Sequence, residues 1–235
     1  MPHNFTIHEA PQGTPEWLAA RVGRATASRA KDILATIKTG EAAARRDYRI
    51  QLVCERLTGA GQDDVFVNAD MERGTALEPE ARRAYEAQTG QWVDQVGFLA
   101  HADLMAGASP DGVIGDYEGL VEIKCPRPAN HLRYLKGLPH RLASVGEAPK
   151  EHAAQITHLL WLTGAAWLDF VSYCPALPDH LALVVRRVDR DEAIIDDYDA
   201  KVRAFLAEVD NELAALVPVG EALAASMERI TDGLR

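Results

Sequence analysis

Three residues near the middle of the chain have types and spacing that could support metal-assisted chemistry. Asp111 follows Ser-Pro, and after ten further residues Glu122 and Lys124 stand two positions apart. Residues two apart on a strand project from the same face, and a hairpin would bring Asp111 beside Glu122. Two adjacent carboxylates repel unless a cation lies between them, and Mg²⁺ or Mn²⁺ prefers such oxygen ligands. The pattern therefore predicts metal-assisted phosphodiester hydrolysis, with the Lys124 ammonium holding a water or a phosphate oxygen.

The same residues also have a purely structural interpretation. Residues 110–112 (Pro-Asp-Gly) are typical of a turn. A Glu and a Lys two positions apart are common on exposed strands. Val121 and Ile123 point to the other face of the predicted strand, which has little else that is polar, and this favours a cleft beside the charged pair. From these residues alone, both interpretations stay open.

Hydrophobic periodicity and capping residues indicate the elements that must position these side chains. The predicted helices cover residues 15–22, 29–37, 42–57, 70–89, 130–138, 150–163 and 191–216, with part of the tail after Pro218 also helical. The predicted strands cover residues 91–100, 104–109, 112–114, 120–124, 167–173 and 181–188. Pro79 predicts a kink or a fresh helix start, because proline lacks a backbone donor. This order predicts an α/β fold, a single mixed domain with a small central sheet flanked by helices.

Composition limits the class of protein. The chain has 235 residues, of which 47% are hydrophobic, enough for one globular domain with a sizeable core. Its net charge of −10 disfavours bulk binding of nucleic acid but does not exclude a local basic groove. No apolar run reaches about 18 residues and the N-terminus has no secretory pattern, so no membrane association is expected. Three distant cysteines fit no zinc spacing and favour a reduced, cytoplasmic setting.

Four sequence blocks stand in a characteristic order. They are residues 16–28, 74–81, 108–126 and 152–173. Together they resemble the lambda exonuclease or YqaJ-type viral recombinase family, the phage alkaline exonucleases, and the third block is similar to the PD-(D/E)-x-K motif. The resemblance implies a single exonuclease domain over residues 1–235, with a restriction-endonuclease-like nuclease core at about 14–190. A C-terminal helical segment at 191–235 would follow the core.

The resemblance also assigns roles around the predicted metal. Asp111 and Glu122 resemble the carboxylates that bind Mg²⁺, with Mn²⁺ as a substitute, and the backbone carbonyl of Ile123 is a further ligand. Lys124 resembles the lysine that positions or activates the attacking water. Glu78 resembles an acidic residue on a helix that completes the metal site. By composition alone, Glu78 would be an ordinary solvated residue, because its helix carries several other glutamates.

Other residues resemble those that organise the site and bind the DNA. Gln155 resembles a glutamine on the helix after the strand, and Arg21 and Ser28 resemble the pair that binds the 5′-terminal phosphate. Each also has a structural alternative. Gln155 would lie on an exposed helix face, Arg21 would be a surface arginine, and Ser28 would be a helix cap. The pairs at residues 45–46 and 82–83 (Arg-Arg) are further candidates for DNA backbone contact, against the alternative of solvated helix faces.

Aromatic and histidine residues favour structural roles. Trp17, Trp161 and Trp167 are predicted to belong to the core rather than to stack on bases. His152 and His158 are six residues apart, which is poor helical spacing for two zinc ligands. The helix at 150–163 has an apolar side, and its other side, with His158, is predicted to be polar and exposed.

The resemblance implies a Mg²⁺-dependent 5′-to-3′ exonuclease of linear double-stranded DNA. Such an enzyme would release mononucleotides and leave a 3′ single-stranded tail. The implied partners are DNA ends and a single-strand annealing protein, and the implied assembly is a homotrimeric ring in the cytoplasm of a bacterial host, encoded by a phage or prophage. Two alternatives stay open: an endonuclease of restriction or repair type with the same core, and a non-catalytic protein that binds DNA ends.

Overall fold

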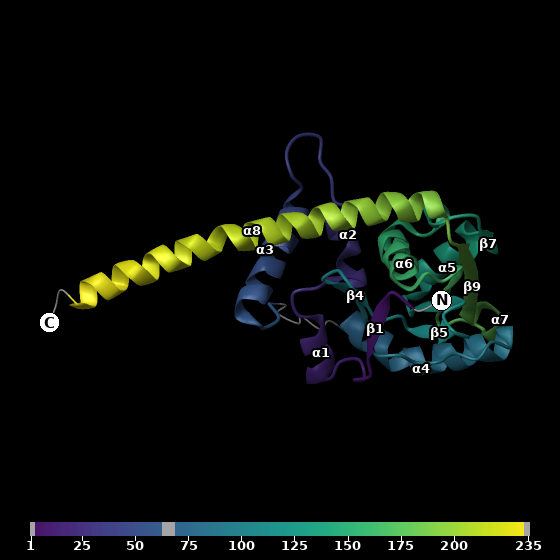
Figure 1. The fold of residues 1–235 in the computed structure, drawn as a ribbon. Helices are drawn as coiled ribbons and strands as arrows, with labels where there is room; N and C mark the ends of the chain where they lie inside the picture. The colour runs from purple at the N-terminus through teal and green to yellow at the C-terminus, as the bar shows by residue number, and fades with distance from the viewer. Residues whose placement is uncertain (1–2, 63–68, 233–235) are drawn as a thin grey trace.

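Two mixed β-sheets and the helices that cover them make up the fold (Figure 1). The computed structural model describes residues 3–62 and 69–232. The helices are α1 (Pro15–Arg21), α2 (Ala30–Ile33), α3 (Ala43–Thr58), α4 (Ala69–Thr89), α5 (Pro128–Gly137), α6 (Lys150–Thr163), α7 (Asp179–Ala182) and α8 (Glu192–Asp232), with 3₁₀ turns η1 (Ala27–Arg29) and η2 (Val145–Glu147). The strands are β1 (Phe5–His8), β2 (Ala25–Thr26), β3 (Phe98–His101), β4 (Ala106–Ala108), β5 (Gly112–Ile114), β6 (Gly119–Lys124), β7 (Arg141–Leu142), β8 (Trp167–Tyr173) and β9 (Leu183–Asp189).

The strand that carries Glu122 and Lys124 lies inside the second sheet. The first sheet has the order β1-β3-β4-β2, and the second has the order β5-β6-β8-β9-β7. Strand β6 pairs in parallel with β8, where Glu122 lies opposite Phe170, and it pairs in antiparallel fashion with β5, where Gly112 lies opposite Val121. The predicted hairpin is confirmed, and it places Asp111 at the start of β5, next to β6.

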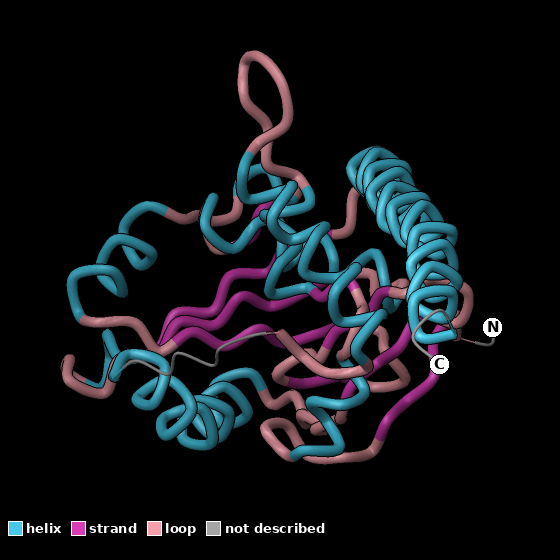
Figure 2. The backbone as a smooth tube through the Cα atoms, turned by 90° about the vertical axis from the view of Figure 1, so that its left-hand side faces the viewer, coloured by secondary structure: helices cyan, strands magenta, loops and turns pink. Residues whose placement is uncertain are grey.

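Alternate residues of β6 pack on opposite faces of the sheet. Leu120 belongs to the same buried cluster as Ile156 of α6, whereas Val121 packs with residues of α4. Figure 2 shows the strands running between helices on both sides. Because side chains alternate along a strand, Glu122 and Lys124 share the face of Leu120 and project toward α6. The sheet therefore directs the charged pair toward the helix that carries Gln155.

The long helix α8 packs by its first half against α3 and then extends beyond the body of the molecule (Figure 1). Its Phe205 stacks on Tyr48 of α3 with ring centroids 5.7 Å apart, and Val209 and Leu52 belong to the same buried cluster. Among the described residues, no helix combines the length and the apolar character needed to cross a lipid bilayer.

Most of the predicted elements are confirmed, but strands β2 and β7 were not predicted, and the strand predicted at residues 91–100 begins only at Phe98. Strand β1 (Phe5–His8) was not predicted, because it buries only Phe5 and is held mainly by backbone pairing with β3. Helix α4 runs through Pro79 without a fresh start, since residues on both sides of the proline pack against the second sheet. The helix predicted at residues 191–216 and the helix expected in the tail form one continuous helix, α8, which runs through Pro218. The predicted single central sheet is instead two sheets.

His158 corrects the prediction of an exposed polar face on α6. It is fully buried, and its Nδ1 lies 2.8 Å from the hydroxyl of Tyr198 on α8. Trp161 packs edge-on against both rings, so this region joins α6 to α8 through an aromatic cluster. Burial lowers the pKa of His158 to about 3, so the folded protein holds this imidazole neutral.

We predict that replacing His158 flattens the pH dependence of stability on the acid side. Below about pH 6.5 the unfolded chain protonates this histidine while the folded protein does not, so stability falls as pH falls. Urea unfolding measures the free energy of unfolding at about pH 7.5 and at about pH 5. The decrease between these two pH values should be roughly 2 kcal/mol smaller in His158→Gln than in wild type. The exposed His180→Gln serves as the control. Equal losses in wild type and His158→Gln would contradict this prediction.

Candidate active site

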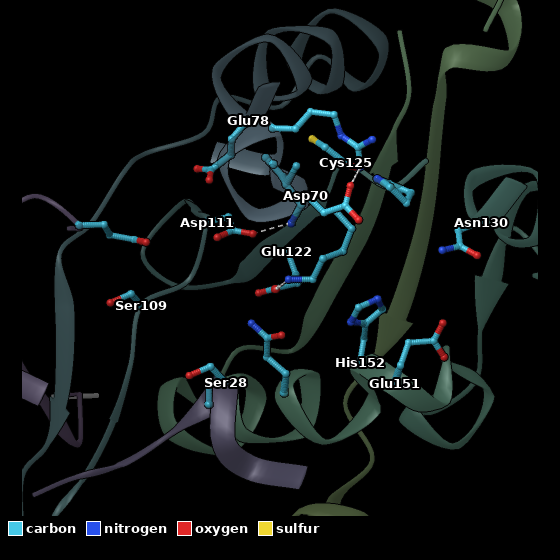
Figure 3. Close-up of a pocket in the computed structure, with 18 of the residues that line it drawn as sticks. Ser28, Asp70, Glu78, Ser109, Asp111, Glu122, Cys125, Asn130, Glu151 and His152 are labelled. Carbon is cyan, nitrogen blue, oxygen red and sulfur yellow. Dashed lines mark hydrogen bonds and ion pairs between the residues drawn. The ribbon is translucent and has the colours of Figure 1, made fainter. Parts of the chain in front are cut away.

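The structure brings all eight predicted site residues to one cleft with a volume of about 680 Å³. They are Arg21, Ser28, Glu78, Asp111, Glu122, Ile123, Lys124 and Gln155. The residues come from α1, η1, α4, the turn before β5, strand β6 and α6. Figure 3 shows Asp111 and Glu122 between Glu78 on one side and Ser28 and His152 on the other. Segments far apart in sequence therefore converge on the acidic pair.

Asp111 and Glu122 are held by different contacts. The Asp111 carboxylate accepts the backbone N–H of Ile123 at 2.7 Å, which fixes the turn against β6. Glu122 is fully buried, and its Oε1 accepts a hydrogen bond from the Lys124 ammonium. Its Oε2 is also buried and has no hydrogen-bond partner among the described residues. A buried carboxylate oxygen without a partner is costly, so this atom marks a position where a cation would be stabilised.

The electrostatics of the cleft reflect this crowding of acids. Burial, together with the charge of Asp111, raises the pKa of Glu122 to about 7. Burial also raises the pKa of Asp111, although Lys124 and the Ile123 N–H oppose the shift. Burial opposes the charge of Lys124, but Glu122 and Asp111 outweigh it and raise the pKa of the ammonium. Without a cation, the carboxyl groups of Glu122 and Asp111 thus lose their protons less readily than exposed carboxyl groups do.

The donor set fits Mg²⁺ better than a metal enclosed by protein side chains. Across residues 3–62 and 69–232, no cluster of three or more His, Cys, Asp or Glu side chains forms a complete metal site. Mg²⁺ keeps several waters and is commonly bound through one or two carboxylates. Asp111 and the unpartnered oxygen of Glu122 match that requirement, and the carbonyl of Ile123 lies on the same lining of the cleft.

Glu78 reaches the cleft from α4. Its Oε1 accepts a hydrogen bond from Arg82 at 2.8 Å, and Arg82 also points toward the backbone carbonyl of Asp111 at 3.5 Å. Burial, followed by the charge of Asp111, raises the pKa of Glu78. Glu78 is therefore part of the acidic cluster and not an ordinary surface glutamate.

Helix α6 presents the polar wall opposite the carboxylates. Gln155 lines the cleft from this helix, as the functional interpretation requires. One turn earlier, His152 lies 3.2 Å from the hydroxyl of Tyr134, which donates to Glu151 at 2.9 Å. Burial, followed by the charge of Lys124, lowers the pKa of His152 to about 4. These neighbours were not predicted as site residues, because α5 and α6 meet only through the tertiary fold.

Arg21 and Ser28 line the cleft from the side of the first sheet. The Arg21 guanidinium lies over Trp17, 4.2 Å from the ring centroid, and the Trp17 indole donates to Ser109 at 2.9 Å. The hydroxyls of Ser28 and Thr26 are 3.3 Å apart. Trp17 is half-buried and lines the cleft, so its predicted place in the core is wrong, whereas Trp161 and Trp167 do pack against buried clusters.

The other arginine candidates are engaged within the fold. Arg45 pairs with Glu41 and Glu208, and Arg82 pairs with Glu78. These bonds give Arg45 and Arg82 structural partners. Arg46 and Arg83, the exposed neighbours of these two residues, stay candidates for DNA contact.

We predict that Asp111→Asn stabilises the protein in the presence of a chelator. The raised pKa of Asp111 means that the folded state binds its proton more tightly than the unfolded state, so ionisation of this group lowers stability as pH rises above 3.8. Asparagine can still accept the Ile123 N–H. At mildly alkaline pH with EDTA, the melting temperature should rise by about 2–4 °C. A lower melting temperature for Asp111→Asn would contradict the electrostatic argument.

Comparison with known proteins finds a family model and solved structures that are similar to this chain. A model of the YqaJ-like viral recombinase domain matches residues 16–166. The crystal structure of an alkaline exonuclease from Laribacter hongkongensis is 40% identical, with a TM-score of 0.76, and the match covers 89% of this chain and 100% of that one. The structure of the same exonuclease in complex with dAMP has a TM-score of 0.77 at the same identity and coverage.

A phage-related exonuclease from Haemophilus somnus 129PT is 13% identical, with a TM-score of 0.63 over 82% of this chain and 96% of that one, and shows a shared fold. No curated protein matches the sequence. The match over residues 16–166 and the 40% identity across nearly the whole chain lead to one conclusion. This chain belongs to the YqaJ-like viral recombinase family and is similar to an alkaline exonuclease of known structure.

Proposed function

We propose that this protein is a Mg²⁺-dependent 5′-to-3′ exonuclease of linear double-stranded DNA. It releases mononucleotides and leaves a 3′ single-stranded tail. The observation that carries the proposal is the one cleft in which the buried Glu122, Asp111 and Lys124 lie with Arg21 and Ser28. The dAMP bound to the similar alkaline exonuclease supports it, because a deoxynucleoside monophosphate is the product that such a reaction releases.

Arg21 and Ser28 bind the terminal 5′ phosphate of the duplex. A guanidinium can donate two parallel hydrogen bonds to phosphate, and a hydroxyl can donate one more. Stacking on Trp17 limits the directions that the Arg21 side chain can take. The terminal phosphate therefore sets which phosphodiester reaches the carboxylates.

Hydrolysis joins the oxygen of a water molecule to the phosphorus between the first and second nucleotides. The bond from that phosphorus to the 3′ oxygen of the first nucleotide breaks, and the 3′ oxygen gains the proton that the water loses. The products are a nucleoside 5′-monophosphate and a duplex with a new 5′ phosphate. Each cycle thus regenerates the group that Arg21 and Ser28 bind.

Asp111, Glu122 and the carbonyl of Ile123 would hold Mg²⁺, with Glu78 acting at a second ion or through a bound water. Bound there, the cation supplies charge stabilisation for the phosphate oxygens and lowers the pKa of water. Lys124 stays protonated beside Glu122 and donates a hydrogen bond to the water or to a phosphate oxygen. Gln155 faces the same space from α6 and orients the reacting groups.

The proposal extends to assembly and partners. A homotrimeric ring around DNA would make digestion processive, because a closed ring cannot easily leave its track. It would also reconcile the net charge of −10 with DNA binding, if basic residues face the channel. The exposed 3′ tail would be bound by a single-strand annealing protein, in the cytoplasm of a bacterial host.

The direct test is digestion of a linear duplex labelled at one 5′ end. With Mg²⁺, labelled mononucleotide should appear, and EDTA should abolish it, with Mn²⁺ as a substitute for Mg²⁺. Lys124→Ala should reduce the rate by about 100-fold or more, because it removes a charged donor aimed at the reacting phosphate. The exposed Lys150→Ala is the matched control and should digest at the wild-type rate.

A covalently closed circle of the same DNA separates the alternatives. Resistance of the circle supports the exonuclease, and cutting of the circle would indicate the endonuclease instead. Tight binding of ends without product under any divalent metal would indicate a non-catalytic protein that binds DNA ends. Either of the last two results would overturn the proposed function.

A further inference from the structure

The short connection between Arg21 and Ser28 is held by side chains of helix α3. Glu55 accepts the backbone N–H of Gly23 at 2.7 Å, and Arg56 donates from Nε to the carbonyl of the same glycine at 2.9 Å. Both polar backbone groups of Gly23 are therefore bound by neighbouring residues of one helix. We call Glu55, Arg56 and Gly23 the Gly23 clamp.

Glu55 is unusual because it is a carboxylate in the interior, with only 5% of its surface exposed. Besides Gly23, it accepts hydrogen bonds from the Gln51 side chain at 2.8 Å and from the backbone N–H of Gln62 at 3.3 Å. A buried carboxylate is costly unless several donors surround it. Its three donors come from three segments, so Glu55 ties the Gly23 turn to α3 and to the chain after it.

The turn at Gly23 depends on a backbone conformation that the clamp supports. Gly23 has φ of +70°, and a Cβ added there would lie 2.7 Å from Cγ of Arg56. The next residue, Arg24, donates its N–H to the carbonyl of Arg21 at 3.1 Å, which closes the end of α1. The conformation of this turn therefore sets the position of the C-terminal end of α1, where Arg21 lies.

Helix α3 also holds the far end of the connection. The hydroxyl of Tyr48 accepts the N–H of Thr26 at 3.0 Å, two residues before Ser28. On the other side, Arg56 pairs with Asp210 of α8 at 2.5 Å. The connection is thus fixed at both ends to α3, and α3 is fixed to the longest helix.

We propose that Glu55 and Arg56 are positioning residues for recognition of the terminal 5′ phosphate. They touch neither the phosphate nor the metal ligands, and they act by holding the Gly23 turn, which sets Arg21 opposite Ser28. Loss of the clamp lets α1 shift, so the two phosphate-binding groups no longer converge. The inference rests on the proposed function, since it assumes that Arg21 and Ser28 bind the DNA end.

The test compares linear duplexes with 5′-phosphate and 5′-hydroxyl ends, using full-length protein and Mg²⁺. The measured quantity is the ratio of kcat/KM for release of the first nucleotide from the two ends, because every later cycle starts from a 5′ phosphate. Wild type should favour the phosphorylated end, and Arg21→Ala should bring the ratio close to 1. Glu55→Gln and Arg56→Lys should each lower the ratio by about tenfold, as expected for loss of a buried hydrogen bond to a charged group. The loss should lie in KM, with kcat at saturating DNA near the wild-type value.

The matched control is Asp169→Asn. Asp169 is another buried carboxylate with three hydrogen bonds, two from Arg187 and one from Tyr85, and it lies outside the cleft. This variant should lower the melting temperature without changing the ratio, which shows what a merely structural loss does. Arg56→Lys keeps the charge that faces Asp210, so it provides a second variant if Glu55→Gln does not fold.

The outcomes separate the inference from the proposed function. If wild type prefers the phosphorylated end and the clamp variants keep that preference, as Asp169→Asn does, the clamp has only a structural role and the inference is overturned. If wild type digests both ends equally, the role of Arg21 and Ser28 fails together with the inference. A lowered ratio in the clamp variants alone supports the inference.

Discussion

The buried carboxylate of Glu122 is the constraint on which the rest of the site depends. One of its oxygens is bound by Lys124, and the other has no hydrogen-bond partner in the described part of the chain. Such a group is tolerated in an interior only when a compensating charge can reach it. Glu122 lies on the face of β6 that α6 covers, so its side chain is fully buried, and Asp111 is fixed beside it through the Ile123 N–H. The fold therefore places two carboxyl groups where the proposed cation would bind.

In the proposed function, one sheet serves the DNA end and the other serves the reacting phosphate. The second sheet supplies Glu122 and Lys124 on β6 and Asp111 in the turn before β5. Helices α4 and α6 cover its two faces. The first sheet and its connections supply Arg21 and Ser28, and helix α3 holds the segment between them. Because the proposed hydrolysis would regenerate a 5′ phosphate, a fixed distance between the two halves would suit repeated removal of one nucleotide. Rigid packing, rather than a mobile loop, sets that distance in this account.

Much of this site could be predicted from sequence, because Asp111, Glu122 and Lys124 are related by local rules. Strand alternation puts the last two on one face, and a turn brings the first beside them. Glu78 and Gln155 could be placed only through resemblance to a family, since α4 and α6 carry many similar polar residues. The roles of all these residues stay predictions, but their convergence in one cleft is confirmed.

What sequence reasoning missed depends on partners far away in the chain. His158 is buried because Tyr198 of α8 bonds to it, and no local pattern reveals that contact. Trp17 lies in the cleft because Ser109 accepts its indole N–H. The Gly23 clamp could not be predicted either, because a glutamate on a helix is expected to be solvated. Only the structure shows that Glu55 is buried among hydrogen-bond donors. In each case a tertiary hydrogen bond determines whether the side chain is buried or exposed, and periodicity alone predicts the opposite.

The central claim is that Glu122 and Asp111 are held together in order to bind a divalent cation. Calorimetric titration of Mg²⁺, and separately of Mn²⁺, into the full-length protein without DNA tests it most directly. The account predicts saturable binding in wild type and its loss in Glu122→Gln, with circular dichroism showing that the variant is folded. Wild type that binds neither ion, or Glu122→Gln that binds as wild type does, would contradict the account.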